Sequence, residues 1–84
     1  MSKIYLDVEV PGNAKKYEFT ADSAMSVGKV KNQIINQIAT VENREIFPNK
    51  EAVLFCSVDL QGLLQDSEIL ADVGIKSGGR IILL

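Results

Sequence analysis

The sequence predicts an α+β domain in which one helix packs across a mixed sheet of four to five strands. Three observations indicate this class. Residues 3–10 alternate apolar and polar side chains, as a strand with one buried face does. From Val27 onward the apolar period changes from two to about 3.6 residues, which is typical of an amphipathic helix. Residues 81–84 are all large and apolar, which is typical of a central strand.

The first two strands are expected to form a hairpin. On residues 3–10 the apolar side chains share one face: Ile4, Leu6, Val8 and Val10. Pro11-Gly12-Asn13 then provides a turn, because proline presets φ while glycine and asparagine tolerate positive φ. Alternation resumes on the second arm with Tyr17, Phe19 and Ala21. Two strands alone are only marginally stable, so their apolar face needs a cover.

The cover is the helix that we expect over residues 27–40, with Ser26 in position to cap its first turn. Its apolar residues recur at spacings of three and four: Val27, Val30, Ile34, Ile35, Ile38 and Val41. In a domain with one helix, a stripe at this spacing belongs to the core, so we expect it to pack on the hairpin. Gly28 lies in the first turn, where glycine costs about 1 kcal/mol relative to alanine, and the sequence offers no reason for it.

The second half of the chain is expected to add the remaining strands. A polar connection leads to a strand over residues 52–58, which is apolar on both parities and so leaves its inward side undecided. A short strand over residues 62–64 follows, and then a helical turn with Leu70 buried and a stop at Gly74. Gly78-Gly79 allows a tight turn into the final, central strand.

Composition limits the chemistry that the chain can perform. At 84 residues it is expected to form one domain, residues 1–84. It has no histidine and one cysteine, Cys56, so we expect no disulfide, no metal site, no cofactor and no Cys–His nucleophile. Cys56 is interpreted as a small core residue. Since no catalytic pair and no phosphate-binding loop is recognisable, we expect no catalytic residues and no enzymatic activity.

Charge and hydropathy narrow the range of partners. The net charge is −2 and the lysines and arginines form no stripe, which argues against a nucleic-acid partner. No apolar run is long enough to span a bilayer, and the N-terminus has no signal-peptide pattern. We therefore expect a cytoplasmic protein that does not insert into a membrane.

The order of the predicted elements is that of the β-grasp, and the chain resembles ubiquitin-like proteins. In the second half, the positions similar to ubiquitin are Leu64, Gln65-Asp66, Leu70-Ala71-Asp72, Ile75 and Ile81-Ile82-Leu83. At the start of the helix they are Ser26-Val27, Val30-Lys31 and Ile34. Within this superfamily, residues 70–84 look most like the ending of the small bacterial YukD-like (EsaB) proteins, with a Gly-Ile step, a glycine-containing turn and a final leucine.

The resemblance implies a non-conjugated ubiquitin-like adaptor or accessory component of a bacterial type VII secretion system, with a membrane-associated secretion component as its protein partner. The alternative is a ubiquitin-type modifier or a sulfur carrier, both of which end in an exposed Gly-Gly. Here Gly78-Gly79 precedes the predicted final strand and the sequence ends at Leu84. This arrangement disfavours the alternative.

Strand parity predicts where a partner docks. If the first strand faces the helix with Ile4 and Leu6, then Tyr5, Ile82 and Leu84 point away from it, and Phe55 joins them if its strand neighbours point inward. The predicted partner-binding patch is therefore Tyr5, Phe55, Ile82 and Leu84. Scattered surface apolar residues need no partner, so the prediction depends on these side chains being contiguous. A homodimer closed through the same patch is the competing interpretation.

Overall fold

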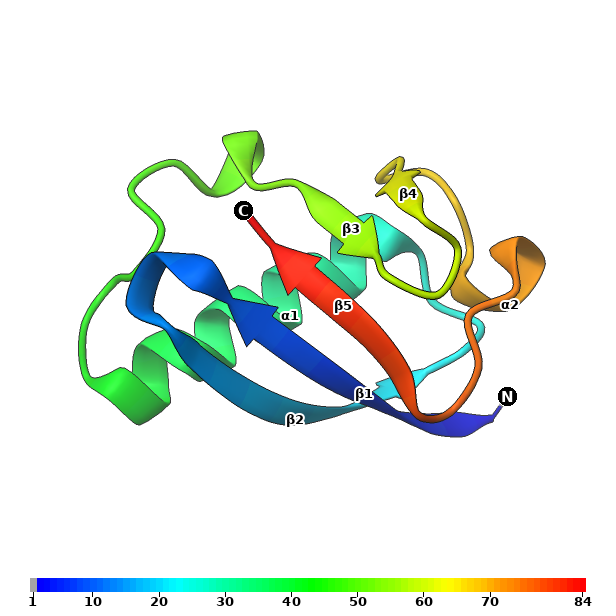
Figure 1. The fold of residues 1–84 in the computed structure, drawn as a ribbon, viewed down its shortest axis with the longest axis horizontal. Helices are drawn as coiled ribbons and strands as arrows, with labels where there is room; N and C mark the ends of the chain where they lie inside the picture. The colour runs from blue at the N-terminus through cyan, green and yellow to red at the C-terminus, as the bar shows by residue number, and fades with distance from the viewer. Residues whose placement is uncertain (1) are drawn as a thin grey trace.

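The computed structural model describes residues 2–84, and it has the predicted β-grasp architecture, with a long helix behind one mixed sheet (Figure 1). The strands are β1 (Lys3–Val10), β2 (Lys15–Asp22), β3 (Phe55–Ser57), β4 (Gly62–Leu64) and β5 (Gly79–Leu83). The helices are α1 (Val27–Glu42) and the short α2 (Leu70–Val73). Single 3₁₀ turns cover Pro11–Asn13 and Lys50–Ala52.

The strand order in the sheet is β2-β1-β5-β3-β4, which confirms that the final strand is central. β1 pairs antiparallel with β2 and parallel with β5, and β5 pairs antiparallel with β3. β3 is shorter than the predicted strand over residues 52–58, because the ladder beyond Phe55 is reduced to one pair. In that pair, Leu54 and Leu84 exchange two backbone hydrogen bonds of 3.0 and 3.2 Å.

The core lies between the inner face of the sheet and α1. The inward residues of β1 and β5 are buried, and so are five of the six predicted stripe residues of the helix: Val27, Val30, Ile34, Ile35 and Ile38. Ser26 caps α1 as predicted, accepting a hydrogen bond from the Lys29 backbone N–H. The placement of Val41 in the stripe was wrong, because the Val41 side chain is exposed. The next residue, Glu42, contacts the hairpin.

The turn at residues 65–68 closes against the first turn of α1 and explains Gly28. Free N–H groups at this helix end donate to backbone carbonyls of the turn, from Val27 to Glu68 at 2.7 Å and from Gly28 to Asp66 at 2.9 Å. A Cβ at position 28 would lie 3.1 Å from the Asp66 Cβ and 3.2 Å from its carbonyl oxygen. Gly28 therefore permits this close approach, and its cost to the helix has a packing reason.

A polar cluster joins the other end of α1 to the hairpin. The Glu42 carboxylate accepts hydrogen bonds of 2.7 Å from both the Lys15 ammonium and the Tyr17 hydroxyl. The hydrogen bond from Lys15 is the larger cause, and that from Tyr17 the next, that lower the pKa of Glu42 below its ordinary value. The same hydrogen bond raises the pKa of Lys15. Burial, and then the hydrogen bond to Glu42, raise the pKa of Tyr17.

Replacing Glu42 by Gln should lower the melting temperature at neutral pH and have a smaller effect in acid. The folded-state pKa of Glu42 is lower than the unfolded value, so its charge stabilises the fold above the unfolded pKa of about 4.3. That contribution is lost as the pH falls through the lowered folded pKa. Thermal melts of both proteins at neutral pH and at about pH 2.5 measure the difference. An equal loss at both pH values would show that the carboxylate charge contributes nothing.

Candidate functional site

An apolar patch lies on the face of the sheet that points away from α1. We call it the outer apolar patch and define it as Leu54, Cys56, Leu63, Ile82 and Leu84. Cys56 of β3 pairs with Ile82 on one side and with Leu63 on the other, while Leu54 faces Leu84 in the adjoining pair. Directly paired residues point to the same face of a sheet, so these five side chains form one continuous group.

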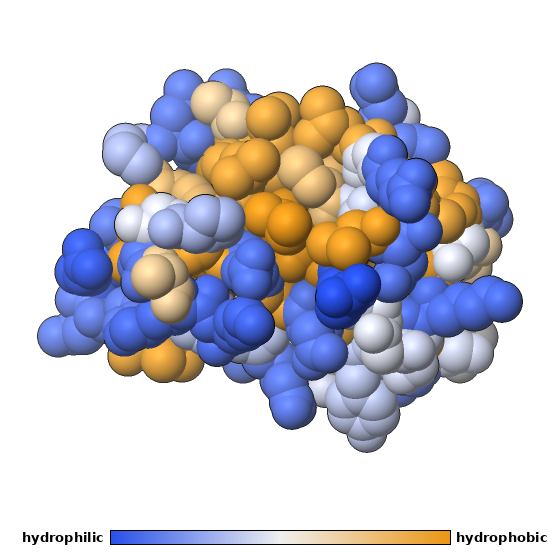
Figure 2. Space-filling view, in the orientation of Figure 1, coloured by the Kyte–Doolittle hydropathy of each residue, from blue (hydrophilic) through white to orange (hydrophobic). Residues whose placement is uncertain are grey.

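The outer apolar patch is open to solvent. Leu54, Leu63 and Leu84 are 46%, 60% and 57% exposed, while Ile82 and Cys56 between them are partly exposed. Figure 2 shows a hydrophobic area where β3 and the end of β5 lie in Figure 1, with polar residues around it. Exposed leucines at neighbouring positions of one sheet face differ from the singly scattered residues of ordinary surfaces, and such contiguous areas mark interaction sites.

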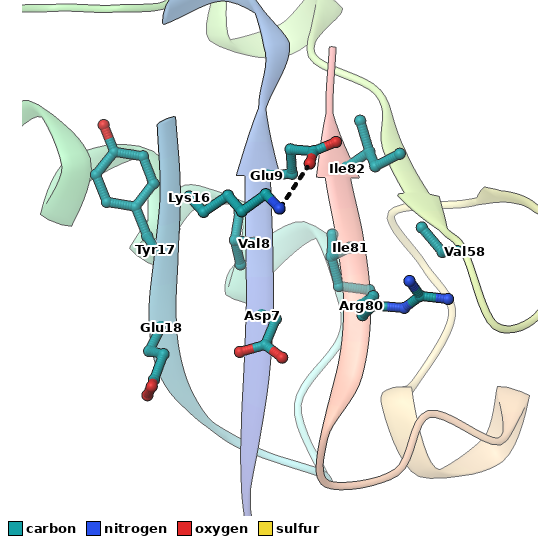
Figure 3. A pocket seen from close by; sticks show the side chains of 10 residues that line it. All are labelled: Asp7, Val8, Glu9, Lys16, Tyr17, Glu18, Val58, Arg80, Ile81 and Ile82. Atoms are coloured by element: carbon teal, nitrogen blue, oxygen red, sulfur yellow. Dashed lines mark ion pairs between the residues drawn. The ribbon is translucent and has the colours of Figure 1, made fainter. Parts of the chain in front are cut away.

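Charged residues of β1, β2 and β5 border this patch. In the row next to Ile82, Glu9 of β1 lies opposite Lys16 of β2, and the two side chains are 3.8 Å apart (Figure 3). In the next row, Glu18, Asp7 and Arg80 lie side by side across the three strands.

A shallow groove of about 300 Å³ runs over these rows. Both rows line it, together with Val58 and Ile82. The groove is therefore continuous with the outer apolar patch.

The structure brings two of the four predicted patch residues together. Ile82 and Leu84 lie on the outer face as expected. Tyr5 also points outward, but the row that holds Asp7 and Arg80 separates it from Ile82. Ile82 lies beside Glu9, four residues along β1 from Tyr5, which is about 13 Å at the rise of a strand. The expectation that Tyr5 belongs to the same patch was therefore wrong.

The placement of Phe55 on the outer face was also wrong. Phe55 is 1% exposed and is among the largest fully buried side chains. It pairs directly with Leu83, which belongs to the core, and paired residues share a face. Cys56, interpreted from the sequence as a core residue, consequently points outward and is only partly buried.

Leu54, Cys56 and Leu63 are the patch residues that the sequence analysis missed. Their strands are apolar at both odd and even positions or are too short to show a period. Hydropathy therefore does not decide which of their residues face the core. The predicted parity of the final strand becomes a usable signal only together with the register of that strand against residues 52–58. Once Leu83 is taken as inward, each residue that pairs with it across the antiparallel ladder is inward too, and its neighbours are outward.

The patch offers docking chemistry and no recognisable catalytic arrangement. The only cysteine, Cys56, lies between Leu63 and Ile82, and the sequence has no histidine to act as its base. Within residues 2–84, no three acidic or cysteine side chains are grouped as metal ligands would be. Over the same residues, neither helix has the length and hydrophobicity that a membrane crossing requires.

Comparison with solved structures places the fold among ubiquitin-like domains. The chain is similar to the N-terminal ubiquitin-like domain of the 4931431F19Rik protein, with a TM-score of 0.76 and 21% identity over 98% of this chain and 73% of that one. It is also similar to the ubiquitin-like domain of the Arabidopsis thaliana protein At2g32350. For two structures of that domain the TM-scores are 0.72 and 0.71, with 21% identity over all of this chain and 87% and 78% of those.

No protein-family description matches the sequence, and no curated protein does. The likeness thus establishes a ubiquitin-like fold and leaves function to the site, because one fold can carry many functions.

Proposed function

We propose that this protein is a non-conjugated ubiquitin-like adaptor that binds a protein partner through the outer apolar patch. The observation that carries the proposal is the continuity of five outward apolar side chains across β4, β3 and β5. Burying such a group against a partner removes apolar area from water at no cost to the core. The protein acts in binding and not in catalysis.

The position of Gly78-Gly79 supports a role without conjugation. It is the only Gly-Gly pair in the sequence. Gly78 has a φ of 87° in the turn before β5, and Gly79 is buried with its N–H hydrogen-bonded to the Lys76 carbonyl at 3.0 Å. A ubiquitin-type modifier or a sulfur carrier needs a Gly-Gly that extends freely into an enzyme, whereas this pair is fixed within the fold. That alternative is therefore the weaker one.

For the cellular setting we propose the cytosolic side of a bacterial type VII secretion system. Support comes from the resemblance of residues 70–84 to YukD-like proteins, with Gly74-Ile75 and the glycine turn before β5 at corresponding places. The partner would then be a membrane-associated secretion component. Genes for a secretion ATPase and for small helical-hairpin substrates beside this gene would support the setting, and their absence would argue against it.

Affinity capture from the source cells tests the docking role. The Ile82→Asp variant places a charge in the centre of the patch and should reduce the recovery of specific partners at least tenfold. Val41→Asp is the matched control, because Val41 is an exposed apolar residue on α1, outside the sheet. Equal recovery with all three proteins would contradict the proposal.

The rival role is tested separately by intact-mass measurement of the protein from its own cells. We expect no adenylate, no thiocarboxylate and no isopeptide adduct. Detection of any of these would favour a modifier or sulfur carrier.

A further inference from the structure

Two carboxylates beside the outer apolar patch have no paired cation among residues 2–84. Asp7 and Glu18 lie directly opposite each other on β1 and β2, point outward and are exposed. Within residues 2–84 neither forms an ion pair. Like charges directly opposite in an antiparallel pair are destabilising, so this position favours a cation supplied from outside.

The two cations that line the groove, Lys16 and Arg80, each lie nearer to another carboxylate. Arg80 is the residue beside Asp7 in the sheet, yet its side chain turns away toward β3 (Figure 3). Its Nε lies 3.9 Å from an Asp59 oxygen, and the Asp59 carboxylate also accepts the Arg80 backbone N–H at 2.9 Å. Lys16 is extended toward Glu9 in the row closer to the patch. Asp7 and Glu18 thus remain available.

The groove connects these carboxylates to the apolar patch. Asp7 and Glu18 line it from β1 and β2, and Ile82 and Val58 line it from the side of β5 and β3 (Figure 3). A segment that covers the outer apolar patch therefore passes beside the groove. One of its long side chains can lie along the groove with its stem on Ile82 and its charged end between the two carboxylates.

We infer that the docking partner is a protein segment that carries a lysine or arginine next to its apolar residues, with the cation received by Asp7 and Glu18. This inference rests on the proposed docking function and adds the chemistry of the partner. An anionic membrane surface would be repelled by the same carboxylates. A second copy of this chain would bring the same face, because a two-fold contact is self-complementary. The cations of that face nearest the patch, Lys16 and Arg80, lie 3.8 and 3.9 Å from carboxylates of their own chain.

Selection from a phage-displayed library of random peptides on the immobilised full chain tests the inference. Selected peptides are titrated against three variants. Asp7→Asn/Glu18→Gln removes the exposed carboxylate pair and keeps its shape. Ile82→Ser removes the apolar centre without changing charge. Glu45→Gln/Asp72→Asn is the matched control, because it removes two exposed carboxylates outside the groove lining.

We expect selected peptides to combine apolar residues with lysine or arginine. Their Kd should rise about tenfold with Asp7→Asn/Glu18→Gln, rise also with Ile82→Ser and stay unchanged in the control. Added salt should weaken binding to the wild type more than to Asp7→Asn/Glu18→Gln.

Peptides that need Ile82 but are neutral or acidic, and that ignore the loss of Asp7 and Glu18, would overturn the inference and leave the docking function standing. Failure to select any peptide that depends on Ile82 would count against the docking function itself. Self-association in sedimentation experiments that Ile82→Ser abolishes would identify the occupant as a second copy and would also overturn the inference.

Discussion

Leu83→Asp should unfold the domain. Leu83 is 0% exposed in the central strand β5 and pairs with the buried Phe55. A carboxylate at this position would lose its water. The buried cation, Lys31, is already bound to Asp66 and the Val53 carbonyl, so the charge would stay uncompensated at a cost of more than about 4 kcal/mol. A domain of this size has a total stability on the order of 5–10 kcal/mol, so little or none would remain. Circular dichroism should show that the cooperative thermal transition is lost or shifted far below that of the wild type.

Ile82→Asp is the matched control, one residue earlier on the same strand. Ile82 points to the outer face, where a carboxylate stays hydrated, although it adds a like charge beside Glu9. We expect a loss of about 1–2 kcal/mol and a melt that remains cooperative. If both variants lost the same large stability, Ile82 would be a core residue and the outer apolar patch would not exist.

The sequence predicted those elements whose apolar period has only one reading. The strict alternation of residues 3–10 assigns Leu6 and Val8 to one face, and the stripe from Val27 to Ile38 allows only a helix. Once these two faces are set, the central place of β5 follows, because its apolar residues need a neighbour on each side. The structure confirms the fold predicted from these patterns.

The site was harder to predict because it depends on register. Residues 53–56 are apolar at every position, so Phe55 and Cys56 are interchangeable by hydropathy, and only the pairing of Phe55 with Leu83 separates them. The parallel register between β1 and β5 likewise decides that Tyr5 lies far from Ile82. Register comes from long-range pairing and turn geometry, which a single sequence does not display at the strand itself.

Lys31 is the charged residue that the helix buries, and its position in the stripe could have revealed this. It lies four residues after Val27 and four before Ile35, on the face that packs on the sheet. The side chain is 4% exposed, and its ammonium donates to the Val53 carbonyl at 3.1 Å and to the Asp66 carboxylate at 2.9 Å. The Asp66 side chain itself is largely exposed. Because Gly28 lets the turn at residues 65–68 approach the helix, the hydrated Asp66 carboxylate reaches the buried Lys31 ammonium.

Asp66→Ala should cost about 2–4 kcal/mol, because, of the partners that residues 2–84 provide, it leaves the buried ammonium only the Val53 carbonyl. Lys31→Met should cost about 1 kcal/mol or less. It fills similar space, leaves Asp66 hydrated and removes the desolvation of the cation, at the price of an unpaired Val53 carbonyl. Urea unfolding of the two variants measures both values, and the double variant Lys31→Met/Asp66→Ala should be no less stable than Lys31→Met alone. Equal losses of unfolding free energy in the two single variants would contradict this expectation. They would show that a buried ammonium without its carboxylate has no special cost, and that Lys31 contributes through the packing of its stem.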